Sequence, residues 1–423
     1  VALAAWVVGR PARICYSRGD SMCASTKRHP SDIRLAVGCD EIGRISGFVF
    51  DGIFNTGAYA SWGPTVANRV PIHASGPYVT KDYRANSVAV HTNAPPAGAF
   101  RGFGVPQSAV AQECAFDLLA EKLGMDRLAF RRLNALKNGV PTVTGQVFNS
   151  GVGIDDCFAA LEDSWHTAVA SAASFNQTAI SDDSPWRRGV GIASCWYGCG
   201  NTSLPNPSTM RMGITADGKI VLHQGAMDIG QGANTVITQI AADALGVPVH
   251  DVHILGGDTD LTPDCGKTSA SRQTFVSGKA AMLSGMALRD RVLRHGNVDA
   301  NAKIALDGAV LTLADAGGGT LRIELADMPV NNHGYVFMAE ETYDPPTSPL
   351  DEKGQGVPYA VFGYGAQIVE LSVDAALGRV RVDKITTAHD VGRAINPLLV
   401  EGQIEGGVAQ GIGMALMEDY QPG

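Results

Sequence analysis

Glycine constrains the folding of this chain more than any other residue. Fifty of the 423 residues are glycine, about 12% where a soluble domain usually has ~7%. They follow no collagen-like period. Because glycine lacks a Cβ atom, it adopts left-handed backbone conformations and lets another group approach the main chain closely. The excess therefore predicts many tight turns or close backbone contacts.

Four segments combine small residues with an amide, a hydroxyl or an arginine, and we expect each to lie next to the start of a helix. They are "GAFRGFG" (98–104), "MDIGQG" (227–232), "KTSASRQT" (267–274) and "EGQIEGG" (401–407). A helix start has unpaired N–H groups and a partial positive charge, which suit a phosphate. Side chains of Gln, Ser and Thr add donors and acceptors that match the edge of a heterocycle. Together the segments predict a large phosphate-bearing cofactor between two domains. Alone, each is compatible with an ordinary turn, a helix cap or a surface arginine.

The apolar patterns predict a mixed α/β (α+β) fold with two domains. In the first half, strands are expected within 32–60 and 86–95, and helices at 106–123 and 125–137. In the second half, a strand and a glycine turn precede the helix "NTVITQIAADALGVP", and a second strand and a long helix from "SRQTFVSG" follow. A hairpin at 366–392 and a helix at 402–417 end the pattern. The polar, small-residue stretch 140–187 predicts a boundary, with domains 1–149 and 150–423.

Charge and cysteine content exclude several classes of protein. The formal net charge is −9 and no basic stripe is present, which argues against nucleic-acid binding. The apolar runs are too short to cross a membrane, and no Walker or dinucleotide-binding motif is present. The eight cysteines are widely spread and suit a reducing compartment; for Cys195 and Cys199 a structural role is favoured over a metal site. We expect a cytoplasmic protein, with the periplasm as the alternative. A start without Met and an end on turn residues indicate a piece of a longer protein.

The four segments, in this order and with their flanks, resemble the molybdenum-binding region of the xanthine oxidase / aldehyde oxidoreductase family. The stretches are "GAFRGFGVPQ", "MDIGQGANTVITQIAADALGVP", "DTDLTPDCGKTSASRQTFVSG" and "INPLLVEGQIEGGVAQGIGMALME". "GRPARICYSRGDSMCASTKRHP" is similar to an earlier segment of that family. The sequences of "SRGDSMCASTKRHP" and "RQTFVSG" are most similar to those of bacterial, Desulfovibrio-type aldehyde oxidoreductases. The resemblance implies two elongated domains with the cofactor at their interface. Residues 1–149 would be the C-terminal part of the first molybdenum domain, and residues 150–423 the second domain, truncated at its C-terminal end.

The resemblance also implies a reaction and its cofactors. A molybdenum hydroxylase of this kind oxidises an aldehyde to a carboxylic acid, and water supplies the oxygen. The molybdenum is held by the dithiolene of a pterin, so no side chain of this chain is expected as a metal ligand. The implied form is molybdopterin cytosine dinucleotide. Electrons would leave through [2Fe-2S] clusters on domains or a partner subunit outside this chain, and the implied assembly is a homodimer.

Residue roles are carried over from the resemblance. Arg101 and Gly102 would lie beside the oxygen ligands of the metal, and Phe103 over the substrate. The expected cofactor contacts are Gly102, Gly230, Gln231, Gly232, Ser269, Ala270, Ser271, Arg272, Gln273 and Gln403. Of these, Arg272 is expected near the phosphate or nucleotide part.

Two residues bear on the substrate that the resemblance implies. Arg69 matches in spacing an arginine that anchors the substrate in purine-oxidising members, and a buried structural arginine is the equal alternative. Asn201 and Thr202 occupy the region where those members have a second phenylalanine that sandwiches purine, and an asparagine there favours an aldehyde.

The family's catalytic glutamate is expected outside this chain. It follows "EGQIEGGVAQG" at some distance, and neither Glu401 nor Glu405 is assigned its role because both belong to the cofactor segment. Two alternatives stay open. One is an N-heterocycle or purine hydroxylase of the same family, and the other is a non-catalytic structural fragment that lacks the base.

Overall fold

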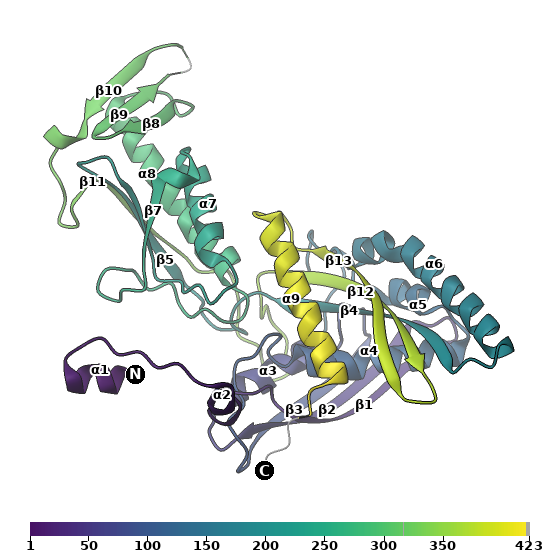
Figure 1. The fold of residues 1–423 in the computed structure, drawn as a ribbon. Coiled ribbons are helices and arrows are strands. Elements are labelled where there is room, and N and C mark those ends of the chain that lie inside the picture. The colour runs from purple at the N-terminus through teal and green to yellow at the C-terminus, as the bar shows by residue number, and fades with distance from the viewer. Residues whose placement is uncertain (316, 420–423) are drawn as a thin grey trace. The chain divides into compact units, whose positions relative to one another are not determined.

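The chain forms two compact units, Val1–Asn134 and Ala135–Glu418, each described by itself below. The structure is a computed structural model, and it describes residues 1–315 and 317–419 (Figure 1). The predicted mixed α/β fold is confirmed. The division falls before the predicted boundary at 149/150, because the intervening residues bind unit 2. Gln146 donates from Nε2 to the carbonyl of Tyr359 (2.7 Å), and the N–H of Gly356 donates to the carbonyl of Thr144 (2.9 Å).

Unit 1 is built on a three-stranded sheet in the order β1-β2-β3. Its elements are α1 (Ala2–Val8), α2 (Arg18–Ala24), β1 (Ser31–Cys39), β2 (Ile45–Gly57), α3 (Gly63–His73), β3 (Asp82–His91), α4 (Val105–Leu123) and α5 (Arg127–Asn134). β1 and β2 are antiparallel, whereas β2 and β3 are parallel and are connected through α3. The strands and the two helices predicted here correspond to β1, β2, β3, α4 and α5.

Aromatic residues form the core of unit 1. Phe48 and Phe54 are buried at alternate positions of β2, and Phe48 meets Phe116 of α4 edge to face with 6.5 Å between ring centroids. A buried ion pair fixes α5 to α4, since Nε of Arg131 donates to Oε2 of Glu113 at 2.7 Å. This packing gives the segment 98–104 a rigid helix to lead into.

The described residues of unit 2 form three sheets and four α-helices. Its elements are α6 (Ile154–Ser181), β4 (Trp186–Gly198), β5 (Ser208–Thr215), β6 (Ile220–Gln224), α7 (Ala233–Leu245), η1 (Val249–Asp251), β7 (Val252–Gly256), the π turn η2 (Gln273–Ser277), α8 (Gly278–Gly296), β8 (Lys303–Asp307), β9 (Val310–Ala314), β10 (Thr320–Glu324), η3 (Leu325–Asp327), β11 (Tyr335–Tyr343), β12 (Phe362–Asp374), β13 (Arg379–Asp390) and α9 (Pro397–Leu416). The strand orders are β13-β12-β4, β11-β5-β6-β7 and β10-β9-β8.

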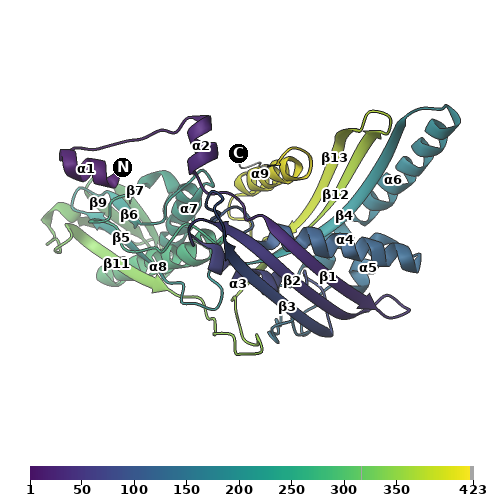
Figure 2. The same cartoon turned by 90° about the horizontal axis from the view of Figure 1, so that it is seen from below.

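The stretch predicted as a boundary is largely the long helix α6. It lies along the antiparallel sheet β13-β12-β4 (Figure 2). Its inward positions recur with helical spacing, and the buried residues are Ile154, Cys157, Phe158, Leu161, Trp165, Ala168, Ala172 and Ala179. The stretch 140–187, predicted as a boundary, thus contains a helix of unit 2 at residues 154–181, because small alanine and serine side chains are compatible with a close helix–sheet contact.

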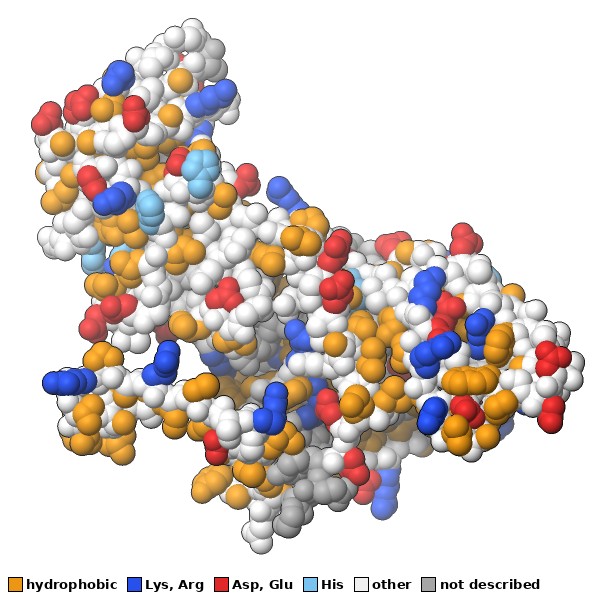
Figure 3. All heavy atoms as spheres, viewed as in Figure 1, with side chains coloured by type: hydrophobic (Ala, Val, Ile, Leu, Met, Phe, Trp, Pro, Cys, Tyr) orange, Lys and Arg blue, Asp and Glu red, His pale blue; other side chains and the backbone are white. Residues whose placement is uncertain are grey.

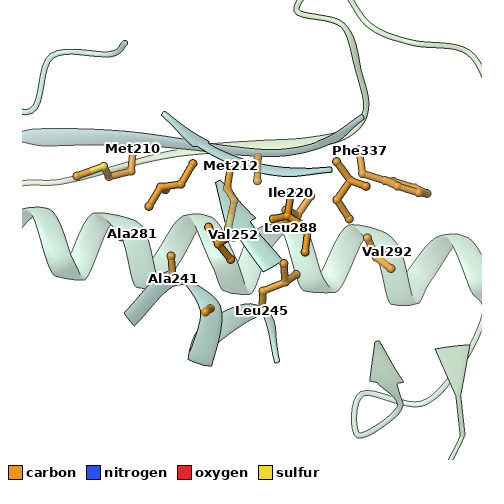
Figure 4. Close-up of a cluster of buried hydrophobic side chains, with 14 of the residues drawn as sticks. Met210, Met212, Ile220, Ala241, Leu245, Val252, Ala281, Leu288, Val292 and Phe337 are labelled. Carbon is orange, nitrogen blue, oxygen red and sulfur yellow. The ribbon is translucent and has the colours of Figure 1, made fainter. Parts of the chain in front are cut away.

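The main core of unit 2 lies between α8, α7 and the sheet β11-β5-β6-β7. Met210 and Met212 of β5 point at α8, where Leu288 and Val292 are buried, and Leu245 of α7 closes the cluster (Figure 4). Alternation on β5 and helical spacing on α8 place these residues on facing surfaces. The loop that follows β6 and the loop that leads into η2 are thus anchored on both sides by a continuous core.

Charged side chains of both signs are dispersed over the face shown in Figure 3. Within the described residues, none of the helices combines the length and the hydropathy that crossing a bilayer requires.

Candidate functional site

The segment 98–104 forms a tight turn that leads into α4. Gly102 and Gly104 have φ values of 89° and 94°, which favour glycine. A Cβ atom would come within 2.4 Å of Cγ of Pro106 at Gly102, and within 2.8 Å of Cγ2 of Val70 at Gly104. Both glycines are therefore required by space as well as by conformation. Arg101 is exposed at the tip of this turn.

Phe103 and Arg69, both predicted to bear on the substrate, lie together in unit 1. Phe103 has a φ of 47° and is 5% exposed. The guanidinium carbon of Arg69 lies 5.4 Å from its ring centroid, and Trp62 meets the ring edge-on at 6.2 Å. Arg69 is buried within α3. The alternative of a buried arginine thus agrees with the position of Arg69, and its predicted contact with a substrate stays a prediction.

His73, one helical turn after Arg69, makes unit 1 sensitive to acid. Its Nδ1–H donates to the carbonyl of Arg69 (3.0 Å). Burial, together with the charge of Arg69, lowers the pKa of His73 from 6.5 to about 3. Between these two pKa values, His73 is protonated in the unfolded chain and neutral in the folded unit. The contribution of His73 to the free energy of unfolding is therefore fully present above pH 6.5. It is lost as the pH drops below 6.5, and the loss is about 2 kcal/mol at pH 5.

Urea unfolding at about pH 7.5 and pH 5 tests this expectation. The loss between the two pH values should be about 2 kcal/mol smaller in His73→Gln than in the parent protein. An equal loss in both proteins would show that another group is responsible.

Asp228 organises the segment 227–232. Its Oδ1 accepts from the N–H groups of Gly230 (2.8 Å) and Gly232 (3.3 Å), and its Oδ2 accepts from the N–H of Asn234 (3.0 Å). Burial opposes the charged form, but these bonds outweigh it and lower the pKa of Asp228. The carboxylate therefore accepts hydrogen bonds from N–H groups at the start of α7, and its negative charge offsets the partial positive charge of that helix end.

Asp228 thus takes the N–H of Asn234 at the start of α7, and the expectation that a phosphate binds at this helix start stays a prediction. Sequence reasoning named the glycines of this turn and missed Asp228. Gln231 also folds back on the turn, because its Nε2 donates to the carbonyl of Met227 (3.2 Å). The predicted cofactor contacts of Gly230, Gln231 and Gly232 stay predictions.

The segment 267–274 contains two residues in a strained conformation. Ala270 and Ser271 have φ values of 61° and 51°, in the left-handed region that costs a non-glycine residue on the order of 1 kcal/mol or more. The N–H of Gly200 donates to the carbonyl of Ala270 (2.8 Å). This bond brings the turn that contains Asn201 beside the segment. The Nδ2 of Asn201 itself donates to the carbonyl of Pro205 (3.3 Å).

Arg272 holds loops together. It is 1% exposed. Its Nη2 donates to the carbonyls of Asn206 (2.9 Å) and Pro207 (2.6 Å). Its Nη1 donates to the carbonyls of Cys265 and Lys267. A direct contact with a phosphate would require the guanidinium to leave some of these backbone carbonyls, and the predicted contact of Arg272 with the cofactor stays a prediction.

Ser269 and Gln273 bind their own segment. The N–H of Ser269 donates to the carbonyl of Lys267 (3.1 Å), and Nε2 of Gln273 donates to the same carbonyl (3.2 Å). The Oε1 of Gln273 accepts from the hydroxyl of Ser277, one turn later. Gln273 thus fixes the start of the π turn to the loop before it.

The segment 401–407 lies inside α9 and not at its start. The helix begins at Pro397, and Oδ1 of Asn396 caps it by accepting from the N–H of Leu399 (3.1 Å). The expectation of a helix start at 401–407 is therefore wrong. Gln403 is exposed one turn further along the helix.

The first turn of α9 contacts the segment 227–232. A Cβ atom on Gly232 would lie 2.8 Å from Cδ1 of Leu399. Nδ2 of Asn396 donates to Oε1 of Gln239 on α7 (3.2 Å). Two of the four predicted segments, 227–232 and 267–274, are joined by the bonds between Met227 and Thr268. The first turn of α9 and the turn of Asn201 adjoin them within unit 2.

The arrangement offers amide, hydroxyl and backbone groups rather than metal ligands. Across residues 1–315 and 317–419, no cluster of three or more His, Cys, Asp or Glu side chains could hold a metal ion. Gly230 is exposed, and a Cβ atom there would meet nothing within 4 Å. A bulky ligand could therefore approach the backbone at this turn.

Comparison with known protein families gives matches along most of the chain. Residues 1–135 and 159–422 each match a model described as "Molybdopterin cofactor-binding domain". The chain is 31% identical over 428 residues to the xanthine dehydrogenase molybdenum-binding subunit of Escherichia coli O157:H7, covering 97% of this chain and 54% of that protein. It is also 31% identical over 430 residues to the aldehyde oxidoreductase of Megalodesulfovibrio gigas, covering 100% and 43%.

Solved structures agree with these matches. The aldehyde oxidoreductase from Desulfovibrio desulfuricans has a TM-score of 0.85 and 29% identity, covering 99% of this chain and 43% of that chain. Quinoline 2-oxidoreductase from Pseudomonas putida shares the fold, with a TM-score of 0.79 and 24% identity over 100% of this chain and 55% of that one. The chain spans about half the length of the curated relatives it matches. With its matched domains, its ordered segments and its fold, the chain belongs to the molybdopterin cofactor-binding domains of the xanthine oxidase family.

Proposed function

We propose that this chain is the cofactor-binding part of a molybdenum hydroxylase that oxidises aldehydes to carboxylic acids. The observation that carries the proposal is the meeting, within unit 2, of the segments 227–232 and 267–274 with the first turn of α9. Sequence segments far apart in the chain thus supply one continuous set of backbone and amide groups. The likeness to Desulfovibrio aldehyde oxidoreductase over nearly the whole chain supports the same assignment.

The residues present fit a molybdopterin cofactor. The open approach to Gly230 and the left-handed backbone of Ala270 and Ser271 are features expected where a bulky ligand lies against the main chain. We propose that Gly230, Gln231 and Gly232, and Ser269 to Gln273, hold the cofactor, with Arg272 acting through the loops that it braces. The bound cofactor supplies the two-electron oxidation and the oxygen transfer from water. We propose the cytosine dinucleotide form, with Gln403 as a further contact.

In unit 1, we propose that the turn 98–104 serves the reacting centre. Arg101 would present its positive charge to oxygen ligands of the metal, and Gly102 would let the backbone approach them. Phe103 would limit the space for the substrate, because its ring is held in place by Trp62 and Arg69. We propose that a glutamate outside residues 1–423 accepts the proton. We also propose [2Fe-2S] clusters outside this chain as electron acceptors, and a homodimer as the assembly.

The substrate class rests on Asn201. Its amide donates to the carbonyl of Pro205 and supplies no aromatic face for stacking a purine. A purine or N-heterocycle hydroxylase is the second candidate. The position of Arg69 over the ring of Phe103 favours it, because an arginine beside an aromatic ring suits a planar, polar substrate.

Metal and nucleotide analysis of the intact protein tests the proposal. Molybdenum bound to the protein and CMP released by acid hydrolysis are expected. A protein that contains neither would contradict the proposed function. Turnover of aldehydes compared with purines and nicotinate then separates the two candidates, and faster turnover of purines would favour the second.

Arg101→Ala is expected to reduce activity far more than stability. The side chain is exposed, so the free energy of unfolding should change by less than about 0.5 kcal/mol. Loss of a charge that faces the reacting centre should lower kcat/KM by about 100-fold or more. Steady-state kinetics and urea unfolding measure the two effects. Arg84→Ala, which removes an exposed arginine of β3, is the matched control and should change neither. Equal losses of activity and stability in Arg101→Ala would indicate a structural role.

A further inference from the structure

The hydroxyl of Thr268 connects two of the predicted cofactor segments. Its Oγ1 donates to the carbonyl of Met227 (2.8 Å) and accepts from the N–H of Met227 (3.1 Å). It also accepts from Nε2 of Gln273 (3.0 Å). A hydroxyl has one donor and two acceptor positions, so these three bonds use its full capacity.

These bonds fix the main chain on both sides of the junction. Met227 directly precedes Asp228, the residue that organises the turn 227–232. Because one side chain holds both the N–H and the carbonyl of Met227, the orientation of the backbone entering the turn is set. On the other side, Gln273 begins the π turn that leads into α8. Thr268 therefore ties the turn to an element that is anchored in the core.

The strained residues lie within the span that Thr268 and Gln273 bracket. Ala270 and Ser271 keep left-handed backbone conformations, which persist only where the surroundings hold them. The bond from Gly200 holds the carbonyl of Ala270 within this span, and the bond between Thr268 and Gln273 joins its two ends. Loss of the hydroxyl would release the end that faces the turn 227–232.

We propose that Thr268 is a positioning residue for the molybdenum cofactor: it sets the separation and register of the segments 227–232 and 268–273. The inference rests on the proposed function, since it assigns the two segments to one ligand. Thr268 acts through Met227 and Gln273. The methyl group of Thr268 has no part in this role, so a serine should replace it and a valine should not.

The test compares three variants of the intact protein. Thr268→Val keeps the shape and removes the hydroxyl, Thr268→Ser keeps the hydroxyl, and Thr262→Val is the matched control. Thr262 is also half-buried, and its hydroxyl donates to the carbonyl of Asp258 (2.6 Å) outside the two segments. Thr268→Ala serves as a second hydroxyl-free variant if the valine disturbs folding.

Cofactor retention is the first readout. During dialysis, Thr268→Val should lose molybdenum and CMP about tenfold faster than the parent protein, the effect of roughly one neutral hydrogen bond or more. Thr268→Ser and Thr262→Val should lose them within about twofold of the parent rate. Unchanged retention in Thr268→Val, or equal loss in Thr262→Val, would overturn the inference.

Amide hydrogen exchange in the cofactor-free protein is the second readout. Residues 225–232 should exchange faster in Thr268→Val than in Thr262→Val or Thr268→Ser. Unchanged exchange would overturn the role of Thr268 even if the parent protein contains molybdenum. A parent protein without molybdenum or CMP would instead overturn the proposed function, so the two failures are distinguishable.

Discussion

Arg272→Met is expected to lower the free energy of unfolding by about 3–5 kcal/mol. The guanidinium is buried and donates to carbonyls of Asn206, Pro207, Cys265 and Lys267. Methionine fills a similar volume but donates nothing, so several buried carbonyls lose a charged partner. Burial lowers the pKa of Arg272, because desolvation disfavours its charged form.

Urea unfolding of the intact protein measures this loss. Lys267→Met is the matched control, because Lys267 lies in the same loop with an exposed side chain, and it should change the free energy of unfolding by less than about 0.5 kcal/mol. Arg272→Lys should recover only part of the loss, since one ammonium group cannot span the carbonyls on both sides. An Arg272→Met protein as stable as the parent would show that the carbonyls find other partners.

Phe103→Ala is expected to destabilise unit 1 by about 3–5 kcal/mol. The ring is 5% exposed and lies between Trp62 and Arg69. Truncation would leave a cavity beneath the turn 98–104 and remove both ring contacts. Because Arg101 and Gly102 belong to the same turn, activity should fall with stability. Thermal or urea unfolding and steady-state kinetics measure the two changes.

Phe103→Leu separates packing from a role at the substrate. Leucine preserves most of the volume, so the free energy of unfolding should fall by less than about 1.5 kcal/mol. If the aromatic face contacts the substrate, the KM of Phe103→Leu should rise while its kcat changes less. A variant with the KM of the parent protein would restrict Phe103 to a structural role.

Most of the regular elements could be predicted from the sequence, because local signals and packing agree there. Gly104 and Pro106 mark the start of α4, and Gly124 ends it in a left-handed conformation. Gly232 and Gly246 flank α7 in the same way. Apolar residues recur along these helices with the helical spacing that the core requires.

The elements that could not be predicted depend on partners distant in sequence. The segment 154–181 is rich in alanine and serine, which fit a linker as well as a helix, and contact with the sheet β13-β12-β4 decides between them. The start of α9 is a different case. Asn396 and Pro397 are a recognisable cap and first residue, whereas the glycine-rich segment that follows favours a later helix start at 402.

The sequence identified the segments of the site better than the roles within them. The resemblance places Arg272 near the phosphate or nucleotide part of the cofactor. The partners of its guanidinium in the fold are carbonyls of residues 206–207 and 265–267. Asp228 had a local signal, since aspartate before a glycine turn often caps a helix. Thr268 had none, because its bond to Met227 exists only after two loops meet.

The π turn at Gln273–Ser277 lies between the loop that contains Arg272 and the helix α8. A π turn accommodates one residue more than an α turn, and one residue corresponds to about 100° of helix rotation. Arg272 can therefore face the loop carbonyls while Ala281 and Leu288 of α8 face the sheet. The extra residue of the π turn thus sets the rotation of α8 relative to the loop before it, so that the loop residues and the core residues each face their own partners.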